Sequence, residues 1–135
     1  MKHYMLDTNT VSYLMKGHTE VSRRIMNIPM SSLCISSLTE GELIFGLAKR
    51  PMAKMLHKIV REFLLRVDVL PWDSKVAETY GYLRAEMENK GITLGHLDML
   101  IAAHALQAKN VLVTADKAFR HISHLSIEDW TTPEL

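Results

Sequence analysis

Hydrophobic positions along this chain fall into short apolar runs separated by longer segments with helical periodicity. Apolar runs at 4–6, 33–35, 67–70 and 111–114 have the length and composition of short, largely buried strands. A further short run near 126–128 predicts an edge strand.

The segments between these runs carry the helix signals. Asp73 is a good N-cap, and the apolar positions after it repeat at helical spacing until Lys90-Gly91 ends the pattern. Ser37 and Glu40 have the spacing of a capping box, and an alanine-rich helix is predicted over about 97–107. Short buried strands that alternate with helices predict a compact three-layer α/β/α domain with a central, mostly parallel sheet, spanning 1–135 as a single domain.

Four acidic residues stand where this architecture would bring them together. Asp7 and Asp116 each follow a predicted buried strand, and Asp98 begins the apolar, alanine-rich helix. Glu42 lies about one and a half turns into the helix that starts near Ser37. In an open parallel sheet, ligands bind outside the carboxyl ends of the strands, so we expect these four carboxylates to line one site.

The chemistry of such a site follows from its charge. Two carboxylates about 4 Å apart repel by roughly 4 kcal/mol at an effective dielectric constant near 20. Without a counter-charge some of them would protonate, and a hard divalent cation resolves this conflict. An all-oxygen set favours Mg²⁺ or Mn²⁺ over Zn²⁺, and such an ion most often serves phosphoryl chemistry. Thr8, Asn9 and Thr114 are candidates to orient the acids, although a capping or turn role explains Thr8 equally well.

The amino-acid composition indicates the cellular compartment in which we expect this protein to act. The 135 residues are 47% hydrophobic and 23% charged, and no apolar run approaches the roughly 20 residues of a membrane helix. An acid at position 7 argues against a signal peptide, and the single Cys34 cannot form an internal disulfide. We therefore expect a cytoplasmic protein without a membrane partner.

The formal net charge of +1 conceals an uneven distribution. The first 66 residues hold 10 Lys/Arg against 5 Asp/Glu, whereas the remainder hold 6 against 10. The basic excess is concentrated in Lys49–Arg66, where Lys54, Lys58 and Arg61 share one predicted helix face. The opposite, apolar face is formed by Leu56, Ile59, Val60, Phe63 and Leu64. This basic helix is either a solvated exterior or a stripe that follows nucleic-acid phosphates.

Several motifs in order resemble one family. They are Met5-Leu6-Asp7-Thr8-Asn9, Ser36-Ser37-Leu38-Thr39 with Glu42-Leu43 and Gly46, Leu97-Asp98 with Ile101-Ala102-Ala103-His104-Ala105, and Val113-Thr114 with Asp116 and Phe119. Each is weak alone, but together they are similar to the PIN-domain ribonucleases. The short length and the ending Ile127-Glu128-Asp129-Trp130 look like the VapC toxins of bacterial toxin–antitoxin modules. The resemblance runs from residue 3 to about 130.

This resemblance implies a function and a set of partners. It implies that Asp7, Glu42, Asp98 and Asp116 hold one or two Mg²⁺ or Mn²⁺ ions. Members of the family cut structured RNA, often transfer RNA, by metal-activated water, and thereby inhibit translation and growth. They form homodimers and are silenced by a VapB antitoxin. We expect this protein to contact DNA only indirectly, through its antitoxin.

Two other classes of protein also bind Mg²⁺ through carboxylates at strand ends. A phosphoacceptor domain or a phosphatase-like α/β domain also gathers carboxylates around Mg²⁺. Either would place a second acid close after Asp7, where this chain has Thr8 and Asn9. A purely structural or DNA-binding module would not need acids in apolar settings. Arg84, on the helix after Asp73, is a further candidate for RNA contact.

Overall fold

Five short parallel strands form the centre of the protein in a computed structural model, which describes residues 2–133. Each strand pairs in parallel with its neighbours in the order β3-β2-β1-β4-β5. The strands are β1 (Tyr4–Leu6), β2 (Leu33–Ser36), β3 (Asp68–Leu70), β4 (Val111–Val113) and β5 (Ile127–Glu128). All five strands predicted from the sequence are confirmed, including the edge strand.

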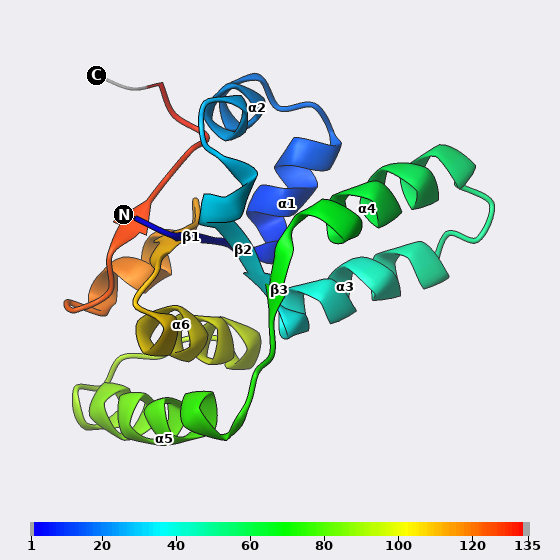
Figure 1. The fold of residues 1–135 in the computed structure, drawn as a ribbon. Helices are drawn as coiled ribbons and strands as arrows, with labels where there is room; N and C mark the ends of the chain where they lie inside the picture. Colours follow the sequence, from blue (N-terminus) through cyan, green and yellow to red (C-terminus); the bar gives the residue numbers. More distant parts are fainter. Residues whose placement is uncertain (1, 134–135) are drawn as a thin grey trace.

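Six α-helices and two short 3₁₀ helices connect these strands. The α-helices are α1 (Thr8–Met15), α2 (Thr19–Met26), α3 (Ser37–Ala48), α4 (Lys54–Arg66), α5 (Ser74–Asn89) and α6 (His96–Ala108). The 3₁₀ helices are η1 (Met30–Ser32) and η2 (Lys117–His121). Helices α5 and α6 lie on one side of the sheet, while α3 and α4 form an arm that extends away on the other side (Figure 1).

The side chains of each strand alternate between the two faces of the sheet and build two separate cores. Met5 and Leu112 pack with the residues of α5 and α6. Leu6, Ile35 and Val113 point the other way and pack with α1, α3 and α4. A sheet buried on both faces is typical of parallel α/β folds, and the predicted three-layer α/β/α architecture is confirmed.

The ends of the helices follow the sequence signals with one exception. Asp73 caps α5 by accepting the backbone N–H groups of Lys75 and Val76, as predicted. The predicted position of the N-cap of α3, at Ser37, is wrong by one residue. Because β2 continues through Ser36, the N-cap is Ser36. The hydroxyl of Ser37 instead accepts the backbone N–H of Trp72 at 3.1 Å.

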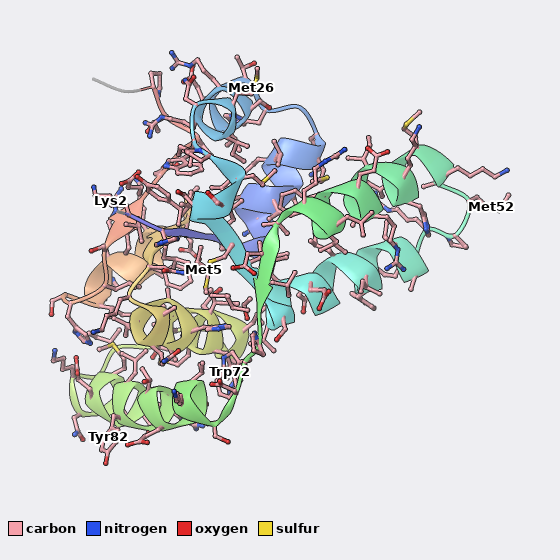
Figure 2. All side chains as sticks on the ribbon, viewed as in Figure 1. Lys2, Met5, Met26, Met52, Trp72 and Tyr82 are labelled. Carbon is pink, nitrogen blue, oxygen red and sulfur yellow. The ribbon has the colours of Figure 1, made fainter. Side chains whose placement is uncertain are left out.

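The arm formed by α3 and α4 exposes several of its apolar side chains to solvent. Val60 and Phe63 are buried as predicted, but Ile59, which was predicted to lie on the same apolar face, is 39% exposed. Met52, in the turn between the two helices, is 82% exposed and stands at the end of the arm (Figure 2). Among the described residues, no helix has both the length and the apolar character that crossing a membrane requires.

Candidate metal centre

Asp7 is fixed where β1 passes into α1. It is the N-cap of α1, and its Oδ1 accepts the backbone N–H of Thr10 at 2.8 Å. Its own backbone N–H donates to the carbonyl of Val113 on β4. Asp7 as a whole is only 7% exposed. The strand order places β2 and β3 on one side of β1, and β4 and β5 on the other. The carboxyl ends of β1 and β4 therefore form the topological switch point at which open α/β sheets bind ligands.

Asp98 approaches the same edge from the other face of the sheet. It lies in the first turn of α6 and is half-buried. Burial raises the pKa of Asp98, and the negative charges of Asp116 and Asp7 raise this pKa further. Three acids that are far apart in the sequence therefore act on one another electrostatically in the fold.

Asp116 and Glu42 complete the set from two further elements. Asp116 is exposed and caps η2, since its Oδ1 accepts the N–H of Ala118 at 2.9 Å. Glu42 is exposed on α3 and lines a cavity of about 160 Å³ together with Asp7 and Asp98. The structure thus places three of the four predicted acids around one cavity, and the fourth acts on Asp98 through its charge.

Three apolar side chains also line this cavity. They belong to Leu97, Ile101 and Phe119, and Phe119 is fully buried. Apolar groups beside the carboxylates lower the local dielectric constant and so strengthen the electrostatic interactions within the cavity. Sequence reasoning did not assign these residues to the site, because an apolar residue that borders a site has the same pattern as one in a core.

The donor set fits a hard divalent cation that keeps part of its water shell. Among residues 2–133, no three His, Cys, Asp or Glu side chains converge closely enough to enclose an ion by themselves. Mg²⁺ is usually held by one or two carboxylates and several waters, so carboxylates spread around a cavity suit it. The carboxylate oxygens around the cavity are ligands of the kind that Mg²⁺ and Mn²⁺ prefer.

The predicted supporting residues have different surroundings. Thr8 and Asn9 line the cavity, and the Thr8 hydroxyl lies 3.4 Å from that of Thr39. Thr114 is buried and accepts the backbone N–H of Asp116 at 3.1 Å, so it shapes the loop that carries this acid. Thr10 was missed, although its position three residues after Asp7 is the usual one for a capping partner.

Buried hydrogen bonds tie the helix of Glu42 to the helix of Asp98. The Nδ1 of His104, on α6, lies 2.8 Å from the hydroxyl of Ser36 at the start of α3. Trp72 adds a second link, since its backbone N–H donates to Ser37 and its Nε1–H donates to the carbonyl of Leu100 on α6. These links fix the relative position of the two helices that carry acids.

The buried His104 makes the stability of the fold depend on pH. Burial lowers the pKa of His104, and the charge of Asp73 opposes this only in part. The unfolded chain therefore binds a proton more readily, so stability is lost as the pH falls below about 6.5, with a slope of at most about 1.4 kcal/mol per pH unit from this group. We expect His104→Gln to lose less stability than the wild type between pH 7.5 and 5.5 in urea denaturation. An equal loss in the two proteins would contradict this assignment.

Arg84 is held within its own helix. Its Nε donates to Glu88 at 2.9 Å and its guanidinium also donates to the hydroxyl of Tyr80 at 3.1 Å. The hydrogen bond to Glu88 raises the pKa of Arg84, and Tyr80 adds to the rise. The side chain is half-exposed and does not line the acidic cavity, and its contact with RNA stays a prediction.

Comparison with known proteins identifies the class to which this fold and site belong. The family model of the PIN domain matches residues 4–125. The tRNA(fMet)-specific endonuclease VapC of Salmonella typhimurium is 38% identical over 131 residues, which cover 96% of this chain and 99% of the relative. The chain therefore belongs to the PIN domain family and, within it, to the VapC group. Nucleases of the PIN family are in general metal-dependent.

Solved structures agree with this assignment. The crystal structure of DNA-bound VapBC from Salmonella typhimurium superposes with a TM-score of 0.88 at 38% identity, covering 96% of this chain and 99% of that chain. VapBC2 from Rickettsia felis, bound to a DNA fragment from its promoter, superposes with a TM-score of 0.86 at 32% identity and covers 94% and 98% of the two chains. The predicted PIN-like fold is confirmed.

Proposed function

We propose that this chain is the toxin of a VapBC-type module and an endoribonuclease that depends on Mg²⁺ or Mn²⁺. The observation that carries the proposal is the placement of Asp7, Glu42 and Asp98 around one cavity, with Asp116 close enough to raise the pKa of Asp98. Nearly full-length similarity to an endonuclease supports the reaction class. Because that relative is named as tRNA(fMet)-specific, transfer RNA is the proposed substrate, and growth inhibition through translation is the proposed result.

Each acid has a role in this proposal. Asp7, Glu42, Asp98 and Asp116 would hold the ion, which supplies an activated water and neutralises charge on the phosphate. The backbone N–H of Thr10 fixes Oδ1 of Asp7, so Oδ2 would be the oxygen that binds the ion. Thr8, Asn9 and Thr114 would support the acids by fixing the loops that carry them.

The proposed partners follow from the relatives. The Salmonella and Rickettsia proteins were solved as DNA-bound VapBC assemblies. For this chain we accordingly propose a cognate VapB-type antitoxin, contact with DNA only through that antitoxin, and a homodimer. We further propose that 1–135 acts as one domain in the cytoplasm, where transfer RNA is found. A phosphoacceptor or phosphatase-like function is not favoured, because the relatives are ribonucleases.

The proposal is tested by incubating antitoxin-free protein with purified transfer RNA. We expect discrete cuts with Mg²⁺ or Mn²⁺ and none with EDTA. Asp7→Asn should lose cleavage while keeping the helix cap, since an amide oxygen can still accept the N–H of Thr10. Glu62→Gln, which makes the same change of charge on the exposed surface of α4, is the matched control. Cleavage that persists in EDTA, or in Asp7→Asn, would overturn the metal centre.

A further inference from the structure

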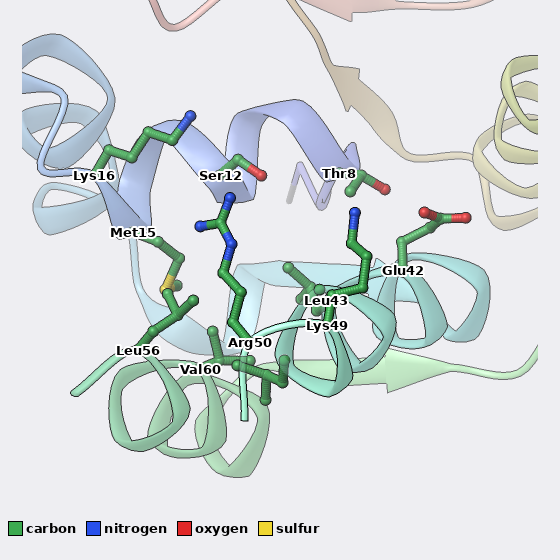
Figure 3. Close-up of a pocket in the computed structure, with 12 residues that line it drawn as sticks. Thr8, Ser12, Met15, Lys16, Glu42, Leu43, Lys49, Arg50, Leu56 and Val60 are labelled. Carbon is green, nitrogen blue, oxygen red and sulfur yellow. The ribbon is translucent and has the colours of Figure 1, made fainter. Parts of the chain in front are cut away.

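A second cavity, of about 290 Å³, lies beside the acidic one between α1, α3 and α4 (Figure 3). The two cavities share Thr8 and Glu42 among their lining residues. Because the cavities share two lining residues, a bound molecule that occupies one can continue into the other. Whatever enters this second cavity therefore lies next to the candidate metal centre.

Three cationic side chains line this second cavity. They are Lys16 at the end of α1, and Lys49 and Arg50 at the turn after α3. Figure 3 shows them in a row: Lys16 stands at one end, Arg50 points toward Ser12, and Lys49 points toward Thr8, beyond which lies Glu42. The row thus leads from the outer end of the cavity to the acidic site.

These cations are not neutralised within the part of the chain that the structure describes. No carboxylate of residues 2–133 lies within 4.0 Å of the charged nitrogens of Lys16, Lys49 or Arg50. The Nζ of Lys49 lies 4.7 Å from the ring centroid of Phe45, a contact that positions the ammonium and leaves its charge unpaired. The backbone at Arg50 is held by His57, whose Nε2 donates to the Arg50 carbonyl.

We propose that Lys16, Arg50 and Lys49 form a track that binds the backbone phosphates of the RNA on one side of the cleaved bond. This inference rests on the proposed function and extends it to the path of the substrate. An acidic centre repels a polyanion, so the flanking phosphates need cations that the acids do not already neutralise. Unpaired lysine and arginine side chains that point into a cavity next to the acids meet this requirement.

The proposal assigns RNA binding to the cations that line the cavity and not to the basic face of α4. The helix face of Lys54, Lys58 and Arg61, predicted from the sequence as a possible phosphate stripe, is exposed, but none of these residues lines the cavity. The groove side of α4 is formed instead by Leu56 and Val60. We therefore expect the basic face of α4 to be a solvated exterior, and it offers a control with the same change of charge.

The test compares two double variants in an Asp98→Asn background, so that the RNA stays intact. The track variant carries Lys49→Gln and Arg50→Gln, and the control carries Lys58→Gln and Arg61→Gln on α4. Binding of 5′-labelled transfer RNA is measured by fluorescence anisotropy in Mg²⁺ buffer over a range of NaCl concentrations. We expect the track variant to raise Kd by about tenfold or more, because hydrogen bonds to charged groups are lost.

The salt dependence provides a second readout. The logarithm of the association constant falls linearly with the logarithm of the salt concentration, and each phosphate contact to a single strand adds about 0.7 to the steepness. Because the track variant loses two such contacts, the magnitude of its slope should be smaller by about 1.4. The control should change Kd by less than about twofold and leave the slope unchanged. Equal Kd values and slopes in the two variants would overturn the track. If the track variant instead kept its RNA affinity and lost antitoxin binding, the cations would serve protein docking, and the proposal would be wrong.

Failure of this inference is distinguishable from failure of the proposed function. With Asp98 intact, the track variant should raise KM for transfer RNA while kcat stays close to that of the wild type. If the wild type cuts RNA but track and control variants bind it alike, the ribonuclease stands and the track fails. If no protein cuts RNA and the track variant still loses affinity, the track stands and the cleavage function fails.

Discussion

Asp98→Asn is expected to slow RNA cleavage by more than about a hundredfold. Loss of a residue that only supports a metal ligand already costs about 10- to 100-fold, so loss of a ligand should cost more. Asp98 interacts with the charges of both Asp116 and Asp7, so its neutral replacement weakens the attraction for the ion at the centre of the site. Single-turnover cleavage over a range of Mg²⁺ concentrations measures the effect.

The same variant should fold at least as well as the wild type without metal. The pKa of Asp98 is raised in the fold, so its ionised form is disfavoured there, and stability is lost as the pH rises through the interval from about 3.8 to that raised value. An amide at this position removes the penalty. Thermal unfolding in EDTA at pH 7 should therefore give Asp98→Asn a Tm equal to or above that of the wild type. Retained cleavage would refute the role of Asp98, and a markedly lower Tm would mean that lost activity reports misfolding.

Trp130→Ala is expected to lower the free energy of unfolding by about 3–5 kcal/mol, the usual range for removing a fully buried aromatic side chain. Trp130 is 1% exposed although it lies only five residues from the end of the chain. Its Nε1–H donates to Glu128 at 2.9 Å, and its ring centroid is 5.2 Å from that of Tyr4. Equilibrium denaturation in urea measures the loss.

Tyr82 provides the matched control for this prediction. It is an aromatic residue on α5 that is 75% exposed, so Tyr82→Ala should change stability by no more than about 0.5 kcal/mol. A loss below about 1 kcal/mol for Trp130→Ala would mean that the segment after β5 does not contribute to the core. A loss of about 3–5 kcal/mol would mean that the segment after β5 stabilises the sheet through the contacts of Trp130 with Tyr4 on β1 and Glu128 on β5.

The hydrogen bonds that link α3 to α6 bear on the prediction for Asp98, because they position the helices that carry Glu42 and Asp98. Glu42 and Asp98 belong to helices on opposite faces of the sheet, and the cavity needs both at one edge. The Ser36–His104 contact and the Trp72 bridge hold the two helices together below that edge. Rigid helices supported in this way can keep carboxylates apart at the distances a hydrated ion needs.

Local features of the sequence determined the elements and the chemistry of this protein. Short apolar runs identified the strands, and Asp7, Asp98 and Asp116 stood out because an acid beside apolar residues is costly without a partner. The cap at Asp73 could be predicted because it depends on a few adjacent residues. The three-layer fold followed from the alternation of strands and helices, which allows few other arrangements.

Only the tertiary structure decided how these parts meet. The order of the strands puts β1 beside β4, and it is long-range packing that brings Glu42, Asp98 and Asp7 around one cavity. The shift of the α3 cap to Ser36 follows from the length of β2. The row of cations brings Lys16, at the end of α1, beside Lys49 and Arg50, which lie more than thirty residues further along the sequence. Periodicity along the sequence does not reveal such proximity, because the proximity results from packing between distant segments.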